Sequence, residues 1–271
     1  MNAPEKFKDA GLPDVQAQRD TRALAIQKAG VRGIRYPIII DTGEKSYPSV
    51  GLFDMTVGLD ASTKGTHMSR FIEVLEDNTN QISYKSVLEL SEAMLARLEA
   101  ESGYIKIKFP FFMEKRAPVS KVPGIMDYQV TYEVYCYKNA PTNVWLEVVV
   151  PVTSLCPCSK NISEYGAHNQ RSHITIKVLV ESAEVEVQDI IKIAEKSASC
   201  ELWSILKRPD EKFVTERAFN NPKFVEDLVR DVAIEMQRLT RKKVVGGFSV
   251  ESENFESIHN HSAFARIEHN T

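Results

Sequence analysis

The stretch that decides the fold is residues 83–112, SYKSVLELSEAMLARLEAESGYIKIKFPFF, because a helical pattern passes directly into a strand pattern. Apolar residues recur every three or four positions through residues 83–101, which predicts a helix with one buried face. Isoleucine and lysine then alternate within residues 104–112, which predicts a strand with one buried and one solvated face. Gly103 is expected to be the first residue beyond the helix cap. Such a pair of patterns is typical of an antiparallel sheet that helices cover on one face.

The same two patterns recur along the rest of the chain. Further strands are expected at residues 31–41, 47–60, 71–75, 128–138, 143–152, 173–181, 244–252 and 262–268. Further helices are expected at residues 187–206 and 222–240, the second with Asn221 as its N-cap and Pro222 in its first position. A strand pair, a helical segment and a second strand pair therefore occur twice in this order. We predict an α+β fold with antiparallel sheets and helices on one face.

Two features bear on the domain organisation. Residues 116–124, RAPVSKVPG, contain two prolines and a glycine and are the expected linker. The hexapeptides GTHMSR (residues 65–70) and GAHNQR (residues 166–171) share the pattern G-x-H-x-x-R. Both follow long loops and are expected to lead into strands, which favours a duplication. The expected divisions are a flexible N-terminal arm at residues 1–20, a first module at residues 21–124 and a second module at residues 125–271.

The composition is that of a soluble globular protein. Of the 271 residues, 43% are hydrophobic and 26% are charged, and the formal net charge is −3. This charge balance gives no basic field for nucleic acid or an anionic membrane. No apolar run approaches the roughly 20 residues that span a bilayer, and the N-terminus lacks the apolar core of a signal peptide. We therefore expect a cytoplasmic protein without a nucleic-acid or membrane partner.

The chemistry is concentrated in residues 153–173, TSLCPCSKNISEYGAHNQRSH. In an extended segment the side chains of Cys156 and Cys158 would point the same way, and His168 follows after a return loop. Thiolate and imidazole are ligands that zinc prefers. The other two cysteines, Cys136 and Cys200, are isolated, so a closed four-ligand structural site is not expected. A carboxylate or water would then complete the coordination, as in a catalytic metal site.

Other interpretations of this loop stay open. Two reduced cysteines without a role, or a hydrogen-bonded structural histidine, are ordinary features of folded proteins. A redox pair is less favoured, because C-P-C lacks the spacing of C-x-x-C. The candidate carboxylates are Asp210, Glu211, Glu216 and Glu226, together with those of the Glu- and His-rich residues 251–261, ESENFESIHNH.

Seven stretches together resemble a known family. They are residues 13–20 (PDVQAQRD), 30–37 (GVRGIRYP), 64–71 (KGTHMSRF), 155–160 (LCPCSK), 165–172 (YGAHNQRS), 206–211 (LKRPDE) and 251–261 (ESENFESIHNH). They resemble the type IB GTP cyclohydrolases, which are metal-dependent hydrolases of the tunnelling-fold superfamily. The resemblance runs from residue 13 almost to the end of the chain, and C-P-C and E-S-I-H-N-H are its most specific elements.

The resemblance implies a fold, a reaction and a metal. The family converts GTP and water to 7,8-dihydroneopterin triphosphate and formate, the first step of folate biosynthesis, with metal-activated water attacking guanine C8. Each subunit has two tunnelling-fold modules, and subunits assemble into a homotetrameric barrel with sites between them. The metal ligands of the family correspond to Cys156, His168 and Glu211. Zn²⁺, Mn²⁺ and Fe²⁺ remain alternatives for the metal.

The resemblance also implies roles for substrate-binding residues. Glu256 corresponds to the glutamate that holds the guanine edge, with His259 nearby as an acid, a base or a phosphate contact. Cys156, His259 and Glu256 are thus the expected catalytic residues. The triphosphate needs cations, for which the candidates in the paired loops are Arg171, Lys64, Arg70 and Lys160.

Two alternatives compete with this interpretation. One is another tunnelling-fold enzyme that acts on a pterin or a deazapurine without this metal chemistry. The other is a non-enzymatic binding module in which zinc only stabilises a loop. The binding module predicts a saturated metal and loss of the fold on chelation, whereas the enzyme predicts an open metal position and a folded, inactive apoprotein.

Overall fold

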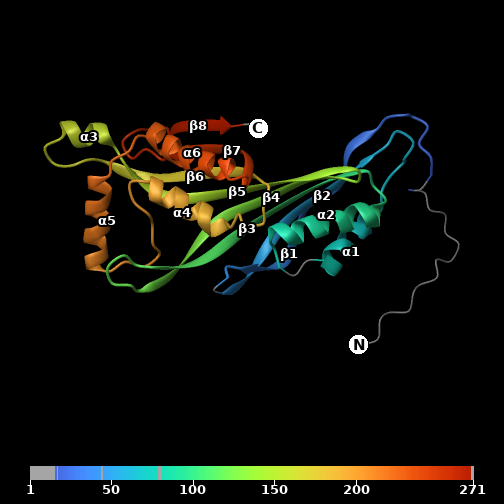
Figure 1. Cartoon of the computed structure of the whole chain (residues 1–271), viewed down its shortest axis with the longest axis horizontal. Helices are drawn as coiled ribbons and strands as arrows, with labels where there is room; N and C mark the ends of the chain where they lie inside the picture. Colours follow the sequence, from blue (N-terminus) through green and yellow to red (C-terminus); the bar gives the residue numbers. More distant parts are fainter. Residues whose placement is uncertain (1–15, 17, 44, 79–80, 270–271) are drawn as a thin grey trace.

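The computed structural model describes residue 16 and residues 18–43, 45–78 and 81–269, and it forms one long sheet with a helical layer (Figure 1). The strands are β1 (Ile26–Asp41), β2 (Ser46–Leu59), β3 (Ser102–Arg116), β4 (Pro123–Tyr137), β5 (Ala140–Leu155), β6 (Asn169–Val180), β7 (Val245–Asn254) and β8 (Ala263–His269). The helices are α1 (Met68–Asn78), α2 (Tyr84–Leu98), α3 (Pro157–Ile162), α4 (Val187–Ser197), α5 (Arg208–Asn220) and α6 (Val225–Arg241). The predicted N-terminal arm falls largely outside the described residues.

All eight strands belong to one antiparallel sheet, in which the spatial order equals the chain order. The first half runs β1, β2, α1, α2, β3, β4, and the second runs β5, β6, α4, α5, α6, β7, β8 with α3 inserted between β5 and β6. The predicted α+β fold and its repeated element order are therefore confirmed. The division at residues 124 and 125 stays a prediction; it falls at the start of β4, which pairs with both β3 and β5.

The core lies between the sheet and the helices that cover one of its faces (Figure 1). The predicted alternation is confirmed in β3 and β6, whose buried apolar side chains are Ile105, Ile107, Phe109 and Phe111, and Ile174, Ile176, Val178 and Val180. The facing side chains of α2 and α6 recur at helical intervals, including Val87, Leu90, Met94, Leu228, Val232 and Met236. Strand period on one layer and helical period on the other thus bring two apolar surfaces together.

Residues 71–75 form part of helix α1, so the strand predicted there is wrong. Phe71, Val74 and Leu75 are buried on one face at helical spacing, and a short apolar run of this kind fits either structure until its packing partner is known. The two G-x-H-x-x-R segments also differ in context, because the first leads into α1 and the second into β6. They occupy different places in the repeated element order and give no support to a duplication.

The helical segment of the second half was predicted with wrong boundaries. Helix α4 ends at Ser197, because the chain then turns extended and Cys200 exchanges backbone hydrogen bonds with Thr153. Helix α5 follows and was not expected. Helix α6 begins at Val225 instead of Pro222, because the side chain of Asn221 donates to the carbonyl of Ala198 at 2.8 Å and does not cap α6.

Residues 116–124 are a hairpin connection and not a linker. Strands β3 and β4 pair as far as Arg116 and Pro123, and the Ala117 N–H closes the turn on the Val122 carbonyl at 3.0 Å. Gly103 lies inside β3, and the left-handed residue that ends α2 is Glu99, with φ of 54°. The predicted cap position was therefore also wrong.

A buried ion pair ties the hairpin to the helical layer. The Lys115 ammonium lies 2.5 Å from Glu195 of α4, and the side chains are 13% and 9% exposed. Tyr128 of β4 donates its hydroxyl to the same carboxylate at 3.0 Å. Lys115 also donates to the Leu202 carbonyl at 2.8 Å and lies over the Trp203 ring. The pair thus fastens the segment between α4 and α5 to the sheet.

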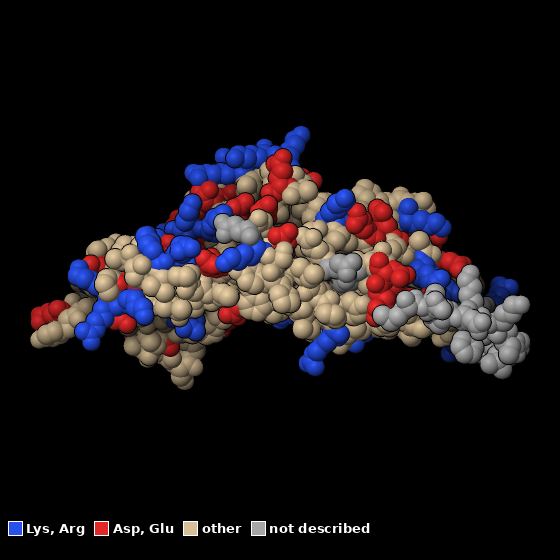
Figure 2. Space-filling model, turned by 90° about the horizontal axis from the view of Figure 1, so that it is seen from below, with Lys and Arg blue, Asp and Glu red and all other residues tan. Residues whose placement is uncertain are grey.

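On the face seen in Figure 2, acidic and basic side chains are interspersed, without an extended area of one sign. No helix within the described ranges is long and apolar enough to cross a membrane.

Candidate functional site

The candidate site lies where three neighbouring strands meet their loops: the end of β5, the start of β6 and the end of β7. Cys156 directly follows β5, His168 directly precedes β6, and Glu256 lies two residues beyond β7. Because adjacent strands are antiparallel, the end of β5, the start of β6 and the end of β7 lie at the same end of the sheet, and the three loops leave it there.

A buried polar cluster fastens the three strand ends to one another. The Ser172 hydroxyl donates to Asn254 Oδ1 at 2.6 Å, and Asn254 Nδ2 donates to Ser154 Oγ at 3.3 Å. Each of these side chains is buried; Ser154 and Asn254 lie two residues from Cys156 and Glu256, and Ser172 lies four residues from His168. Satisfied buried hydrogen bonds hold strand ends in one relative position, so the loops start from a defined geometry.

Cys156 is the N-cap of α3, which the sequence interpretation did not anticipate. Its sulfur accepts the Ser159 N–H at 3.5 Å, and its own N–H donates to the His168 carbonyl at 3.1 Å. Cys156 is half-buried, whereas Cys158 is exposed on the first turn of α3. The prediction that both thiols face one cavity from an extended segment is therefore wrong, because Pro157 starts a helix between them.

His168 and Glu256 approach each other beside Gln170. His168 Nδ1 lies 3.0 Å from Gln170 Oε1 and 4.0 Å from Glu256 Oε2. Gln170 Nε2 donates to Glu256 Oε1 at 3.4 Å. The His168 and Glu256 side chains are 16% and 12% exposed, so the group is a sheltered imidazole–amide–carboxylate chain.

The donor types of this corner fit a divalent metal in part. Cys156 supplies a thiol and His168 an imidazole, the mixture that zinc prefers. Within the described ranges, no three His, Cys, Asp or Glu side chains lie close enough together to hold an ion. Cys156 and His168 are neighbours through the hydrogen bond from the Cys156 N–H to the His168 carbonyl, and Glu211 on α5 does not form a three-donor group with them.

Asp210, an alternative third ligand, is instead a structural cap of α5. Its fully buried carboxylate accepts the N–H groups of Val119, Ser120 and Lys207, each at 2.8 Å, and the Ser120 hydroxyl at 2.6 Å. Burial alone raises the pKa of this carboxyl group, but the hydrogen bonds outweigh burial and hold the pKa well below its usual range. Each carboxylate oxygen already accepts two hydrogen bonds, so neither is available to bind a metal.

The neighbouring acidic residues differ from Asp210. Glu211 is exposed, and its carboxylate has no hydrogen-bond or ion-pair partner among the residues that the structure describes. Glu216 accepts from Lys212 at 2.6 Å, and Glu226 is exposed in the first turn of α6. Among the described acidic residues of α5, Glu211 is thus the one whose carboxylate is not engaged by another group.

Replacing Asp210 by alanine should lower the melting temperature by several degrees and leave metal stoichiometry unchanged. The carboxylate has a lower pKa in the folded than in the unfolded chain, so its contribution is complete above the unfolded pKa of about 3.9. The contribution is lost as the pH falls through the folded value. The stability difference between wild type and Asp210→Ala, measured by thermal unfolding, should therefore be constant near neutral pH and shrink in acid.

Glu211→Gln is the matched comparison, because it changes the adjacent carboxylate on the same helix turn. It should weaken metal binding and leave the melting temperature of the apoprotein near that of the wild type. The reverse pattern, with metal lost in Asp210→Ala and retained in Glu211→Gln, would contradict this assignment.

The predicted phosphate-binding cations are divided between two ends of the molecule. Arg171 is exposed on β6, and the Lys160 ammonium donates to the Phe219 carbonyl at the end of α5. Lys64 donates to Gln18 at 2.9 Å, and Arg70 lies 3.8 Å from Glu99. The segment between β2 and α1, which leads to Arg70, lies at the opposite end from α3 (Figure 1).

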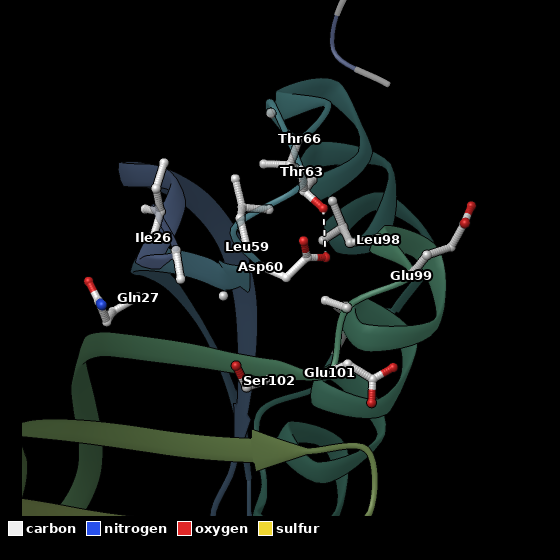
Figure 3. A pocket seen from close by; sticks show the side chains of 14 residues that line it. Ile26, Gln27, Leu59, Asp60, Thr63, Thr66, Leu98, Glu99, Glu101 and Ser102 are labelled. Atoms are coloured by element: carbon white, nitrogen blue, oxygen red, sulfur yellow. Dashed lines mark hydrogen bonds between the residues drawn. The ribbon is translucent and has the colours of Figure 1, made fainter. Parts of the chain in front are cut away.

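A cavity of about 410 Å³ opens beside this distant segment, between the start of β1, the end of β2 and the end of α2 (Figure 3). Three carboxylates line it, those of Asp60, Glu99 and Glu101. Hydrogen bonds from Ser62 and then Thr63 lower the pKa of Asp60 to about 2, so this group is ionised at neutral pH. An acidic cavity repels a triphosphate, and it is not by itself a nucleotide site.

The remaining predicted residue, His259, is exposed in the loop between β7 and β8. Its ring stacks on His261 at a centroid distance of 5.2 Å. None of the described contacts joins it to the chain of His168, Gln170 and Glu256.

The sequence interpretation missed the residues that connect the site. Gln170 and Asn254 both lie within motifs of the sequence analysis, but the motifs imply no role for either. Both are polar residues at buried positions of otherwise alternating strands, and that mismatch with the apolar pattern is the signal that could have found them.

Solved structures define the class of fold. A uricase from Bacillus fastidious superimposes with a TM-score of 0.52 at 12% identity, over 82% of each chain. A uricase from Arthrobacter globiformis gives 0.50 at 8% identity, over 90% of this chain and 93% of the uricase. At such low identity these likenesses show the fold alone, which is an α+β fold with an antiparallel sheet and helices on one face.

Sequence relatives define the family. Residues 12–265 match the family described as type I GTP cyclohydrolase folE2. "GTP cyclohydrolase FolE2" of Cupriavidus pinatubonensis is 54% identical over 257 residues, which are 95% of this chain and 93% of that protein. The protein of the same name from Paraburkholderia xenovorans is 54% identical over 258 residues, 95% and 94% of the two chains. The chain belongs to the type I GTP cyclohydrolase folE2 family.

Proposed function

We propose that this protein hydrolyses GTP to 7,8-dihydroneopterin triphosphate and formate, the entry step of folate biosynthesis, in the cytoplasm. The observation that carries the proposal is that Cys156, His168 and Glu256 lie next to one another at one end of the sheet, in a chain of this family. A thiol, an imidazole and a sheltered carboxylate are the groups that the reaction needs for metal binding, proton transfer and recognition of guanine.

Cys156 and His168 would hold the metal, with Glu211 as the third ligand. Bound there, a divalent ion such as Zn²⁺, Mn²⁺ or Fe²⁺ supplies a Lewis acid that makes water a nucleophile at neutral pH. Cys156 is half-buried at the start of α3, and His168 directly precedes the neighbouring strand β6.

Glu256 would bind the guanine base. A carboxylate can accept two parallel hydrogen bonds, from the guanine N1–H and the 2-amino group. Gln170 holds one oxygen of Glu256 from the side, so the carboxylate has a defined orientation before substrate arrives. His259 is a candidate for proton transfer or phosphate contact, since its side chain is exposed beside that of His261 in the loop that follows Glu256.

We further propose that the functional unit is a homotetramer of chains with two tunnelling-fold modules each. Lys64 and Arg70 are expected to bind phosphate, yet the segment between β2 and α1 lies at the opposite end of the chain from α3 (Figure 1). A second subunit that brings this end against the Cys156 loop of the first would reunite the set. Sites between subunits would explain why the cations expected to bind phosphate lie at two ends of a single chain.

The direct test is to incubate the metal-loaded protein with GTP and to measure formate and, after oxidation, pterin fluorescence. The chelated protein is the control. We expect both products with metal and neither without it, while circular dichroism of the chelated protein stays that of a folded chain. Formate without pterin would indicate a ring-opening enzyme that stops early.

No turnover, together with loss of the fold on chelation, would favour the zinc-stabilised binding module. No turnover with a folded apoprotein would favour another tunnelling-fold enzyme acting on a pterin or a deazapurine.

A further inference from the structure

We infer that Gln170 is a positioning residue that holds His168 in the Nδ1–H tautomer and thereby keeps Nε2 available for the metal. This inference rests on the proposed function and deepens it, because it concerns how the site is prepared before metal or substrate binds. Gln170 touches neither the guanine nor the metal in this assignment and acts through His168.

Three oxygen atoms converge on one nitrogen of the His168 ring. Gln170 Oε1 lies 3.0 Å from Nδ1, Ser257 Oγ lies 3.4 Å away, and Glu256 Oε2 lies 4.0 Å away. A carbonyl and a carboxylate can only accept a hydrogen bond, so the nitrogen that they face must donate one. Nδ1 therefore carries the proton of the neutral ring, and Nε2 carries the lone pair.

The orientation of the Gln170 amide is fixed from its other end. Its Nε2 lies 3.4 Å from Glu256 Oε1, and an amide nitrogen facing a carboxylate oxygen donates a hydrogen bond. The reversed amide would place two acceptor oxygens against each other at Glu256, and an amino group against Nδ1. The carboxylate thus sets the donor-to-acceptor direction of both hydrogen bonds, from His168 to Gln170 and from Gln170 to Glu256.

Burial protects the hydrogen bonds between His168, Gln170 and Glu256 from competition by water. Gln170 is 8% exposed and lies at an inward position of β6, in register with Ser154 of β5. Little water can replace the amide oxygen as the partner of Nδ1. In the described part of the chain, no hydrogen bond involves Nε2 of His168, so the lone pair is not consumed by another protein group.

The consequence concerns metal binding directly. A histidine binds a metal through its unprotonated nitrogen, and the partner of the other nitrogen sets which one that is. The free imidazole of histidine favours the Nε2–H tautomer in water, which would block the nitrogen assigned to the metal. Gln170 reverses this preference in the apoprotein and orients the ring.

The test compares Gln170→Met with Gln170→Glu in the full-length, metal-free chain. Methionine fills similar space but cannot accept a hydrogen bond in this way. Beside Glu256 the new glutamic acid is expected to be protonated, so that its carbonyl oxygen can still accept from Nδ1 while its O–H donates to Glu256. Long-range ¹H–¹⁵N spectra of the histidine-labelled protein report the tautomer, and the His168 signals are identified by their loss in His168→Ala. Zn²⁺ affinity is measured by competition with a chelator.

We expect Gln170→Met to lose the Nδ1–H signature of His168 and to bind Zn²⁺ roughly 10- to 100-fold more weakly, the range found for residues that orient metal ligands. Gln170→Glu should keep the signature. Asn169→Ala, at the exposed neighbouring position, is the matched control and should resemble the wild type in both measurements. If Gln170→Met does not fold, Gln170→Asn, whose shorter amide cannot span His168 and Glu256, takes its place.

An Nδ1–H tautomer and a Zn²⁺ affinity that persist in Gln170→Met would overturn the inference. An Nε2–H tautomer in the wild type would do the same. Neither measurement uses GTP, so its outcome is independent of turnover. A protein that fails to turn over GTP yet shows the Gln170-dependent tautomer would refute the proposed reaction and leave this inference standing.

Discussion

Replacing Cys156 by serine should reduce GTP turnover by about 100-fold or more, because even residues that only orient metal ligands cost about 10- to 100-fold when they are replaced. Serine is the informative substitution, since Cys156 is also the N-cap of α3 and serine is a good N-cap residue. The change thus removes the thiolate and keeps the helix start. The rate of formate release at saturating metal and GTP, beside metal content, is the measurement.

Cys158→Ser is the matched control for this prediction. Cys158 is two residues away, chemically identical and exposed on α3, and its sulfur has no place in the assigned site. It should retain turnover within a few-fold of the wild type. Equal losses in the two variants would mean that the C-P-C segment matters as a unit and that the separate roles assigned to the two thiols are wrong.

Replacing Lys115 by methionine should lower the free energy of unfolding by about 3–5 kcal/mol, the range for removing one partner of a buried ion pair. The cost arises because Glu195 would remain charged, sheltered and without its cation. The Tyr128 hydroxyl donates to Glu195 but cannot supply the missing positive charge. Burial first, and then the neighbouring Glu195, raise its pKa far above the usual range, so it remains a neutral donor.

Denaturant unfolding measures this effect, with Lys138→Met as the control. Lys138 lies 2.7 Å from Glu101, but both side chains are mostly exposed, and exposed pairs contribute at most about 1 kcal/mol. The double variant Lys115→Met with Glu195→Leu should recover much of the lost stability, because no unpaired charge remains. Similar small losses for Lys115→Met and Lys138→Met would show that the buried pair is not a stabilising anchor of the α4–α5 segment.

Much of the fold could be predicted because local periodicity reports which side of an element is buried. The alternation in β3 and β6 and the helical spacing in α2 and α6 predicted the correct structure and the correct inward faces. The strand predicted at residues 71–75 was wrong because a short, mostly apolar stretch of five residues fits both the strand period and the helix period. The helix predicted through residues 198–206 was wrong because hydrogen bonds to Thr153, far away in sequence, decide that the chain leaves the helix there.

The candidate site divides in the same way. Motifs marked Cys156, His168 and Glu256, whose approach depends on strand ends that the sheet places side by side. No local pattern distinguished Asp210 from Glu211, because the groups that occupy Asp210 come from the β3–β4 hairpin some ninety residues earlier. The connecting role of Gln170 likewise depends on Glu256 from another strand.

The sequence by itself determined the α+β class, the inward faces of its elements and the family, because period and motif are properties of neighbouring residues. Only the tertiary structure decided that Cys158 points to solvent, that Asp210 is a cap, that Gln170 joins His168 to Glu256, and that the cation candidates lie at two ends. Each of these outcomes depends on a partner from a distant part of the chain. Burial and hydrogen bonding to that partner, which no local pattern encodes, set the role of the residue.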